Sequence, residues 1–210
     1  MAKNVVIAIA GEIGSGKDHI TNLISGYIGR EGKPRFKVIS IIRFADPIKK
    51  GIAGMFDHYT DFLYRDKNKV LVSEFKYTVP GGGQIKLTYG ALQQYFGDAM
   101  RNIDKDIFCK IVVNKTNYTD KLVIIPDLRF SNELNHLKSK LDDDKKLILI
   151  KLIGIYDLKS KDNRDRNHES ETEVRNLSIN EFDYILNVNT YQGEDMKHMV
   201  KQILVKERIL

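Results

Sequence analysis

An apolar run followed by a glycine-rich turn and a helix-forming segment begins this chain. Residues 5–10 (VVIAIA) form a predicted buried strand, and residues 11–18 (GEIGSGKD) follow it directly. Glycines in such a turn tolerate backbone angles that aim successive N–H groups at one point, where they can bind phosphate oxygens. Lys17 begins a predicted helix over 17–29 and can reach the outer phosphates of a nucleotide. The strand, the GxxxxGK turn and the helix together predict a nucleoside triphosphate site formed by Gly11, Gly14, Ser15, Gly16, Lys17, Asp18 and His19.

Asp18 stands where this motif usually has Ser or Thr, whose hydroxyl binds Mg²⁺. A carboxylate is also a hard oxygen ligand, so Asp18 could hold the ion directly or through water. The alternative is that Asp18 only stabilises the helix N-terminus, where the backbone dipole favours a negative charge. Asp18 is therefore the candidate metal ligand of this sequence.

The composition fits one soluble enzyme domain. The 210 residues are 42% hydrophobic and 30% charged, which is enough for a substantial core in a single domain over 1–210. The single cysteine, Cys109, excludes an internal disulfide and fits a reducing compartment. No apolar run has the length of a membrane span, and the first strand leaves no visible signal peptide, so we expect a cytoplasmic protein.

The net charge of +6 leaves two interpretations open. A nucleic-acid-binding protein would concentrate its basic residues, interleaved with aromatic ones, on one face. Here the 34 basic residues are spread along the chain and alternate with acids such as those at 142–144. A small polyanionic substrate explains the excess of positive charge equally well.

Strand and helix patterns alternate along the chain, which predicts a three-layer α/β domain. Continuously apolar runs such as 122–125 are typical of parallel strands that are buried on both faces. We expect a mainly parallel five-stranded sheet, with strands at 5–10, 36–42, 122–125, 147–153 and 184–186. Predicted helices cover 17–29, a segment from about 46, 89–102, 105–115, 131–140 and 194–206. The glycine triplet at 81–83 predicts a hairpin or mobile loop within a substrate-side insertion over 57–87.

Polar side chains follow two predicted strands at the edge where parallel sheets bind their ligands. Lys49 comes after the second strand, and Asp127 and Arg129 come after the third. Asp127 could hold metal-bound water or orient a substrate, and Arg129 offers a planar fork to a phosphate. The alternative is a structural Asp127–Arg129 pair that only fixes the turn.

The highly charged segment at 156–168 predicts a surface loop that is able to close over a site as a lid. Basic side chains on a lid neutralise charge during phosphoryl transfer. Arg164 and Arg166 are therefore candidate catalytic residues beside Lys17, Asp127 and Arg129. The alternative is an ordinary solvated loop, for which a high charge content is common.

Five short motifs together resemble one family. They are GEIGSGKD at 11–18, FADPIK at 44–49, LQQYFGD at 92–98 with Arg101, IIPDLRFSNE at 124–133 and HESE at 168–171. This combination is similar to the deoxynucleoside monophosphate kinases that large phages and viruses encode, over about residues 4–205. The resemblance implies a P-loop kinase fold that transfers the γ-phosphate of ATP, with Mg²⁺, to a deoxynucleoside 5′-monophosphate (dNMP).

The resemblance also implies roles for single residues. Residues 11–18 correspond to the ATP phosphate loop, Lys49 to a basic residue beside the monophosphate, and Gln94 to a residue of the nucleoside pocket that reads a base edge. His168 belongs to an element after the lid, where it is either catalytic or only a helix-entry residue. The substrate-binding residues implied are Lys49, Gln94, Gly97, Asp98, Arg101, Phe108, Asp127, Arg129, Glu133, His168 and Glu171.

Three positions depart from the family pattern. Gly90 lies where an Arg is usual, Phe108 replaces a Trp, and residues 153–155 (IGI) replace an Arg-Pro dipeptide. Phe108 keeps an aromatic wall but lacks the indole N–H donor. These departures concern the identity of the substrate and not the class of reaction.

Two other functions stay open. One is a P-loop kinase for another phosphorylated small molecule, of the phosphomevalonate or dephospho-coenzyme A type. The other is a nucleotide-dependent regulatory or nucleic-acid-binding module. Gln94 and the aromatic residues Tyr95, Phe96 and Phe108 suit a flat base, so a dNMP kinase is the leading hypothesis. We expect ATP and a dNMP as ligands, no membrane or nucleic-acid partner, and leave a homodimer open.

Overall fold

The computed structural model describes residues 4–30, 36, 39–55, 62–63, 68, 71–78, 82–118, 122–154 and 169–210. The strands in these ranges are β1 (Asn4–Ala10), β2 (Ile39–Ile41), β3 (Val72–Thr78), β4 (Gln84–Thr88), β5 (Leu122–Leu128), β6 (Lys145–Ile153) and β7 (Tyr184–Asn187). The α-helices are α1 (Lys17–Arg30), α2 (Asp46–Met55), α5 (Tyr89–Ile103), α6 (Ile107–Asn117), α7 (Ser131–Lys140), α8 (Glu169–Asn176) and α9 (Gly193–Lys206). A short 3₁₀ helix covers Ile179–Glu181. None of the helices in these ranges combines the length and the apolar character that a membrane crossing requires.

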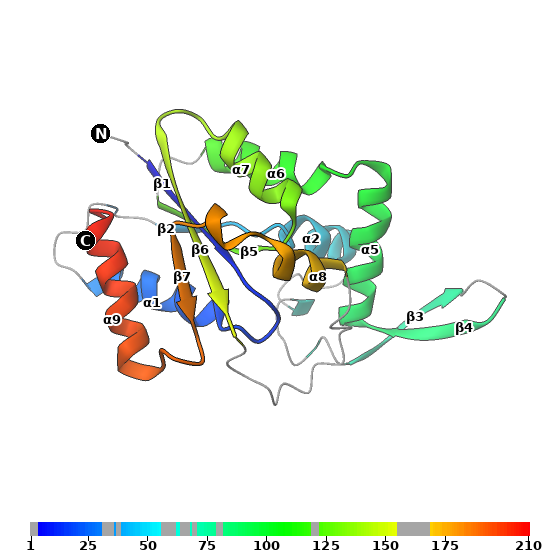
Figure 1. Ribbon diagram of the computed structural model, residues 1–210. Coiled ribbons are helices and arrows are strands. Elements are labelled where there is room, and N and C mark those ends of the chain that lie inside the picture. The colour runs from blue at the N-terminus through cyan, green and yellow to red at the C-terminus, as the bar shows by residue number, and fades with distance from the viewer. Residues whose placement is uncertain are drawn as a thin grey trace.

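Five strands form a parallel sheet in the order β2-β5-β1-β6-β7 (Figure 1). The central strand is β1, in which Val5 pairs with Leu122 of β5 on one side and with Lys146 of β6 on the other. Every residue of β1 is buried, as expected for a parallel strand that helices cover on both faces. The predicted α/β class and five-stranded parallel sheet are confirmed.

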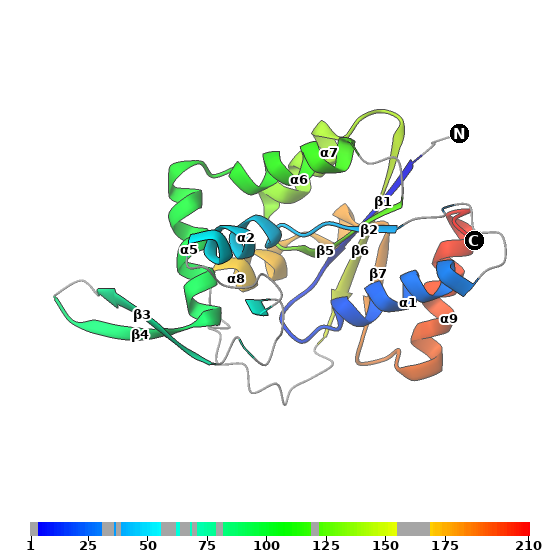
Figure 2. The same cartoon turned by 180° about the vertical axis from the view of Figure 1, so that it is seen from behind.

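Side chains of β1 alternate between two apolar cores, one on each face of the sheet. Ile7 and Ile9 belong to the core that α1 and α9 complete, and these two helices lie together in Figures 1 and 2. Val6 and Ala8 belong to the opposite core, together with apolar residues of α2, α6, α7 and α8. The sheet is therefore the middle layer of three, and its carboxyl edge carries the phosphate-loop turn.

One strand boundary and one helix differ from the sequence predictions for identifiable reasons. The predicted strand at 122–125 covered only the continuously apolar run before Pro126 and Asp127. The strand in fact continues to Leu128, and its register against β1 shifts between Ala8 and Ala10, beside this proline. Apart from the possible helix entry at His168, no helix range was predicted for α8, because its residues are polar except for Val174 and no apolar periodicity marks it.

The segment with the glycine triplet contains an antiparallel hairpin of β3 and β4, with Lys76 opposite Lys86. Figures 1 and 2 show the hairpin extending away from the main sheet, next to the beginning of α5. Gly82, at the entrance to β4, has φ +94, a conformation that side chains with a Cβ rarely adopt. Of the predicted insertion over 57–87, the described part is therefore mainly this hairpin, and the predicted lid at 156–168 lies outside the described residues.

Candidate functional site

The turn between β1 and α1 has the backbone geometry of a phosphate-binding loop. Gly14 and Gly16 have φ values of 79° and 84°, which only glycine adopts without strain. Gly11 is fixed by packing instead, because a Cβ there would lie 2.5 Å from Oγ of Ser15 and 3.1 Å from Cβ of Leu152. The loop therefore needs glycine at all three positions, for two different reasons.

Lys17 lies at the first position of α1 with its ammonium group turned back over the loop. Its Nζ donates to the carbonyl oxygens of Gly11 at 2.6 Å and Glu12 at 2.7 Å. This places the positive charge directly beside the turn, at a helix N-terminus that already favours anions. The arrangement can hold a chain of phosphates.

A cleft of about 200 Å³ opens at the carboxyl edge of the sheet, between the loop after β1 and the loop after β5. The connections from the two neighbouring strands β1 and β5 run toward opposite edges of the sheet. The connection from β1 leads through α1 to β2 at one edge, and the connection from β5 leads through α7 to β6 toward the other edge. Parallel sheets bind their ligands at such a switch point. The structure brings together at this cleft the predicted residues Lys17, Asp18, Lys49, Gln94, Arg101, Asp127, Arg129 and Glu133.

Two further residues of the cleft were not among the sequence predictions. Arg43 follows β2, and its guanidinium lies 3.3 Å from Oδ1 of Asp18. Gln93 lies on α5, and its Nε2 is buried without a hydrogen-bond partner among the described residues. The sequence signal for Arg43 was its position directly after a predicted strand, and the signal for Gln93 was its position next to Gln94. A buried amide with no partner is uncommon in proteins, so the Gln93 amide is a candidate donor to a ligand.

Arg129 is held by a carboxylate that also reaches the phosphate loop. Oε1 of Glu171, on α8, forms an ion pair with NH1 of Arg129. Its other oxygen, Oε2, accepts from the backbone N–H of Ile13 at 2.8 Å. Glu171 is 2% exposed and is absent from the cleft wall, so we expect it to position Arg129 and the loop. This differs from the substrate contact that the sequence resemblance implied for Glu171.

Asp127 connects the end of β5 to the loop after β2. Its two carboxylate oxygens accept backbone N–H bonds from Phe44 at 3.0 Å and Ala45 at 2.9 Å. Burial raises the pKa of Asp127, while these N–H groups and the nearby Arg129 and Arg43 oppose that shift. Asp127 therefore fixes the backbone that carries Arg43 and also lines the cleft itself. It stays a candidate for orienting a substrate or metal-bound water.

Glu133 is a second buried carboxylate that lines the cleft. Its Oε2 accepts from the backbone N–H groups of Arg129 at 2.8 Å and Phe130 at 3.0 Å, which closes the first turn of α7. Burial raises the pKa of Glu133 to about 7, and the nearby charge of Asp127 acts in the same direction. The protonated form is therefore substantially populated at neutral pH.

This raised pKa predicts a pH-dependent stability. An unfolded glutamate loses its proton at about pH 4.3, whereas the folded protein keeps it up to about pH 7, so stability falls as the pH rises through that window. Between about pH 5 and about pH 8, we expect wild type to lose about 2 kcal/mol more unfolding free energy than Glu133→Gln. Urea unfolding at both pH values measures this difference. An equal pH dependence for the two proteins would show that Glu133 is ionised throughout the range.

Arg101 lines the cleft and contacts two aromatic rings. Its guanidinium carbon is 4.3 Å from the centroid of Phe130 and 5.1 Å from that of Phe108. Asp98 adds an ion pair at 3.4 Å, one turn before Arg101 on α5. Cation–π contacts of this kind hold the planar fork in a fixed orientation. Arg101 can therefore present a preformed cation to the cleft.

Phe108 and Gly97 do not line the cleft, in contrast to the roles that the resemblance implied. Phe108 is 3% exposed and packs in the core beside Arg101. A Cβ at Gly97 would lie 3.1 Å from both Arg101 NH1 and Ile48 Cδ1, so this glycine allows α5 to approach α2. Both residues support the position of Arg101. Neither the ring of Phe108 nor the backbone of Gly97 is part of the cleft wall.

A smaller hollow lies on the other side of the phosphate loop. Ser15, Gly16 and His19 line it together with Tyr191 and Gln192, which follow β7. The predicted residue His19 therefore lies beside the loop but away from the main cleft. The predicted residues Arg164, Arg166 and His168 lie outside the described residues.

No protein-family model matches this chain, and no curated protein matches it in sequence. Among solved structures, the chain is similar to a shikimate kinase from Acinetobacter baumannii in complex with shikimate, with 13% identity, a TM-score of 0.47, and coverage of 97% of this chain and 92% of that one. It is also similar to a shikimate kinase from Bacteroides thetaiotaomicron, with 9% identity, a TM-score of 0.40, and coverage of 97% and 98%.

Proposed function

We propose that this protein transfers the γ-phosphate of ATP to a deoxynucleoside 5′-monophosphate, giving ADP and the deoxynucleoside diphosphate. One observation carries the proposal: a single cleft that begins at the phosphate loop gathers cationic groups and two carboxamides. These are Lys17, Arg43, Lys49, Arg101 and Arg129, with Gln93 and Gln94. Such a set suits an acceptor that combines a phosphate with a hydrogen-bonding planar group.

The donor nucleotide belongs on the phosphate loop. Its phosphates would lie across the N–H groups of residues 14–17, with Lys17 against the outer ones. The nucleoside of ATP would extend past His19 and Tyr191, which lie beside the loop on the side away from the cleft. Asp18 fits Mg²⁺, since its carboxylate is at the cleft mouth and its side chain is 73% exposed. The ion would neutralise charge on the donor phosphates.

The acceptor phosphate belongs beside Arg129. Arg129 and Arg43 follow the neighbouring strands β5 and β2, Lys49 lies on α2, and all three line the cleft together with Lys17. The nucleoside would then extend toward α5, where Gln93 and Gln94 can pair with a base edge. Gly90 also lines this part of the cleft, where the family usually has an arginine, and leaves room there. We infer that Arg43 or Arg101 supplies the missing cation.

The reaction needs orientation and charge neutralisation more than covalent catalysis. An oxygen of the acceptor phosphate attacks the γ-phosphorus, and the bond to the β–γ bridging oxygen of ATP breaks as ADP leaves. Lys17 and Arg129 stand on the donor and acceptor sides of this transfer. Fixed cations in a partly closed cleft stabilise the charge that the transferred group spreads over its oxygens.

An acceptor panel tests the proposal. The protein is assayed for ADP release with each dNMP, each ribonucleoside monophosphate, phosphomevalonate, dephospho-coenzyme A and shikimate. We expect a dNMP as the best acceptor. An unmet buried 2′-hydroxyl costs about 1–3 kcal/mol, so the matching ribonucleotide should have a kcat/KM about 5- to 150-fold lower. A best acceptor other than a nucleoside monophosphate would refute the substrate class, whereas equal dNMP and NMP rates would refute only the sugar preference.

A further inference from the structure

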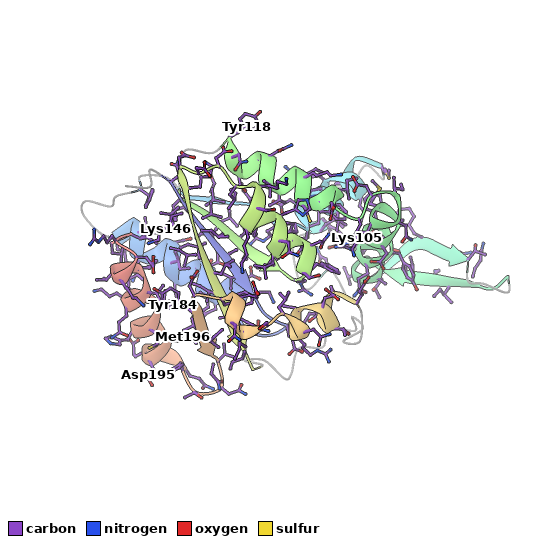
Figure 3. The ribbon with its side chains drawn as sticks, turned by 45° about the horizontal axis from the view of Figure 1, so that its top comes forward. Lys105, Tyr118, Lys146, Tyr184, Asp195 and Met196 are labelled. Carbon is purple, nitrogen blue, oxygen red and sulfur yellow. The ribbon has the colours of Figure 1, made fainter. Side chains whose placement is uncertain are left out.

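Three side chains with metal-ligating atoms converge between α6 and α7, apart from the cleft. Asp106 directly precedes α6, Cys109 lies one turn along it, and His136 lies on α7, which packs against α6. One potential ligand atom from each residue lies within 4.8 Å of those of the other two. Lys105, labelled in Figure 3, is the neighbour of Asp106 and marks this junction near the start of α6.

The hydrogen bonding of His136 fixes its ring in the form that binds metals. Nδ1 lies 3.0 Å from the carbonyl oxygen of Asn132, an atom that can only accept, so Nδ1 carries a proton. In the neutral ring, Nε2 then presents its lone pair, 3.9 Å from Oδ2 of Asp106. Histidines in protein metal sites are oriented by this same bond from the other ring nitrogen to a backbone carbonyl.

Asn132 also orients the carboxylate of Asp106. Its Nδ2 donates to Oδ1 of Asp106 at 2.9 Å and to the carbonyl oxygen of Lys105 at 3.0 Å. The other carboxylate oxygen of Asp106, Oδ2, is the one that lies next to His136. One residue thus positions two of the three groups, through its side chain and its backbone, as residues around a metal site do.

Cys109 contributes a sulfur that is shielded from solvent. The residue is 1% exposed, whereas the side chains of Asp106 and His136 are 36% and 21% exposed. An ion can therefore reach the cluster from the side of these two residues. Burial raises the pKa of the Cys109 thiol to about 12, so metal binding would release its proton to the solvent.

We propose that Asp106, Cys109 and His136 form a Zn²⁺ site, with water as the fourth ligand. Oxygen, sulfur and imidazole nitrogen are the ligands of tetrahedral zinc, whereas Mg²⁺ prefers six oxygens, so this site differs from the one expected at Asp18. Ligand atoms around zinc lie about 3.5 Å apart, given bonds of about 2.0–2.3 Å. Small rotations of the two partly exposed side chains close the gap from the observed separations.

A zinc ion here would connect two helices that support the cleft. The first turn of α7 contains Glu133, which holds the backbone of Arg129. An ion bound by Cys109 of α6 and His136 of α7 would hold the two helices together and so fix the first turn of α7. The site is independent of the proposed kinase function, since none of its three ligands lines the cleft.

The test uses the full-length protein after chelator treatment, without nucleotide or Mg²⁺, titrated with Co²⁺ and then Zn²⁺. We expect one equivalent of Co²⁺ to bind with a thiolate-to-cobalt charge-transfer band in the near ultraviolet, and Zn²⁺ to displace it. Cys109→Ser should abolish the band, and His136→Gln should weaken binding by about 100-fold or more. Asn132→Ala should weaken it by about 10- to 100-fold, because it removes the bond that orients Asp106. His198→Gln, at an exposed histidine on α9, is the matched control and should bind as wild type does.

Three results would overturn the proposal: no charge-transfer band in wild type, an unchanged band in Cys109→Ser, or equal weakening by His136→Gln and His198→Gln. The last would identify adventitious binding to surface histidines, and the first an ordinary Asp106–His136 ion pair. Circular dichroism checks the folding of each variant. If Cys109→Ser does not fold, Asp106→Asn and His136→Gln still decide the question, because both residues are partly exposed.

Discussion

Replacement of Lys17 by alanine should reduce kcat/KM for phosphoryl transfer by about 1,000-fold or more, a loss of about 4 kcal/mol in transition-state stabilisation. The side chain has no role in the apolar cores, and its Nζ donates to the carbonyl oxygens of Gly11 and Glu12 and to the hydroxyl of Ser15, all in the loop that a nucleotide would cover. We therefore expect a folded protein with a nearly unchanged melting temperature. Steady-state kinetics with saturating ATP and Mg²⁺, together with a thermal melt, measure both quantities.

Lys201→Ala is the matched control for this substitution. Lys201 is an exposed lysine on α9 that does not line the cleft, so its loss removes the same charge without touching the cleft. We expect near-normal activity for this variant. A folded Lys17→Ala protein with near-normal kcat would contradict the assignment of the turn as a catalytic phosphate loop.

Replacement of Arg129 by lysine should impair use of the acceptor far more than binding of ATP. Lysine keeps the charge but loses the planar fork that can hold Glu171 and a phosphate at the same time. Loss of one bidentate, charge-assisted contact is worth about 1.5–3 kcal/mol, so the KM for the dNMP should rise by about 10- to 150-fold. Isothermal titration with ATP and with the dNMP separately should show an ATP affinity within a few-fold of wild type.

Glu171→Gln distinguishes the two possible roles of Arg129. Glutamine keeps an acceptor for Ile13 but removes the charge that orients the arginine, so the same preferential loss of dNMP binding should appear in weaker form. Equal weakening of ATP and dNMP in Arg129→Lys would instead assign this arginine a structural role at the loop. In that case the acceptor phosphate would have to be bound by Arg43 or Lys49.

The elements of the sheet and its helices were largely predictable because their signals are local. The run at 122–125 had the continuous apolar character of a buried parallel strand, and the predicted helix at 131–140 matches α7 (Ser131–Lys140). The strand at 36–42 was predicted too long, since β2 is limited to Ile39–Ile41 among the described residues. The helix α8 was missed because its buried face includes Glu171, a charged residue that no hydrophobic pattern marks.

The cleft was predictable only in part, because its contacts join distant parts of the chain. The turn at 11–18 and the strand-end residues Asp127 and Arg129 carry local signals that place them at one edge of a parallel sheet. The contact from Glu171 to Ile13 joins residues 158 positions apart, and only the tertiary fold reveals it. The same holds for Arg101, whose orientation depends on two phenylalanines from different segments.

Transfer of label from γ-labelled ATP tests the central claim most directly. The protein is incubated with labelled ATP, Mg²⁺ and the best dNMP of the panel, and the products are separated by chromatography. We predict that the label appears in the deoxynucleoside diphosphate in an amount equal to the ADP formed, and that Lys17→Ala abolishes it. Label found only in inorganic phosphate, or in no product at all with any dNMP, would contradict the account.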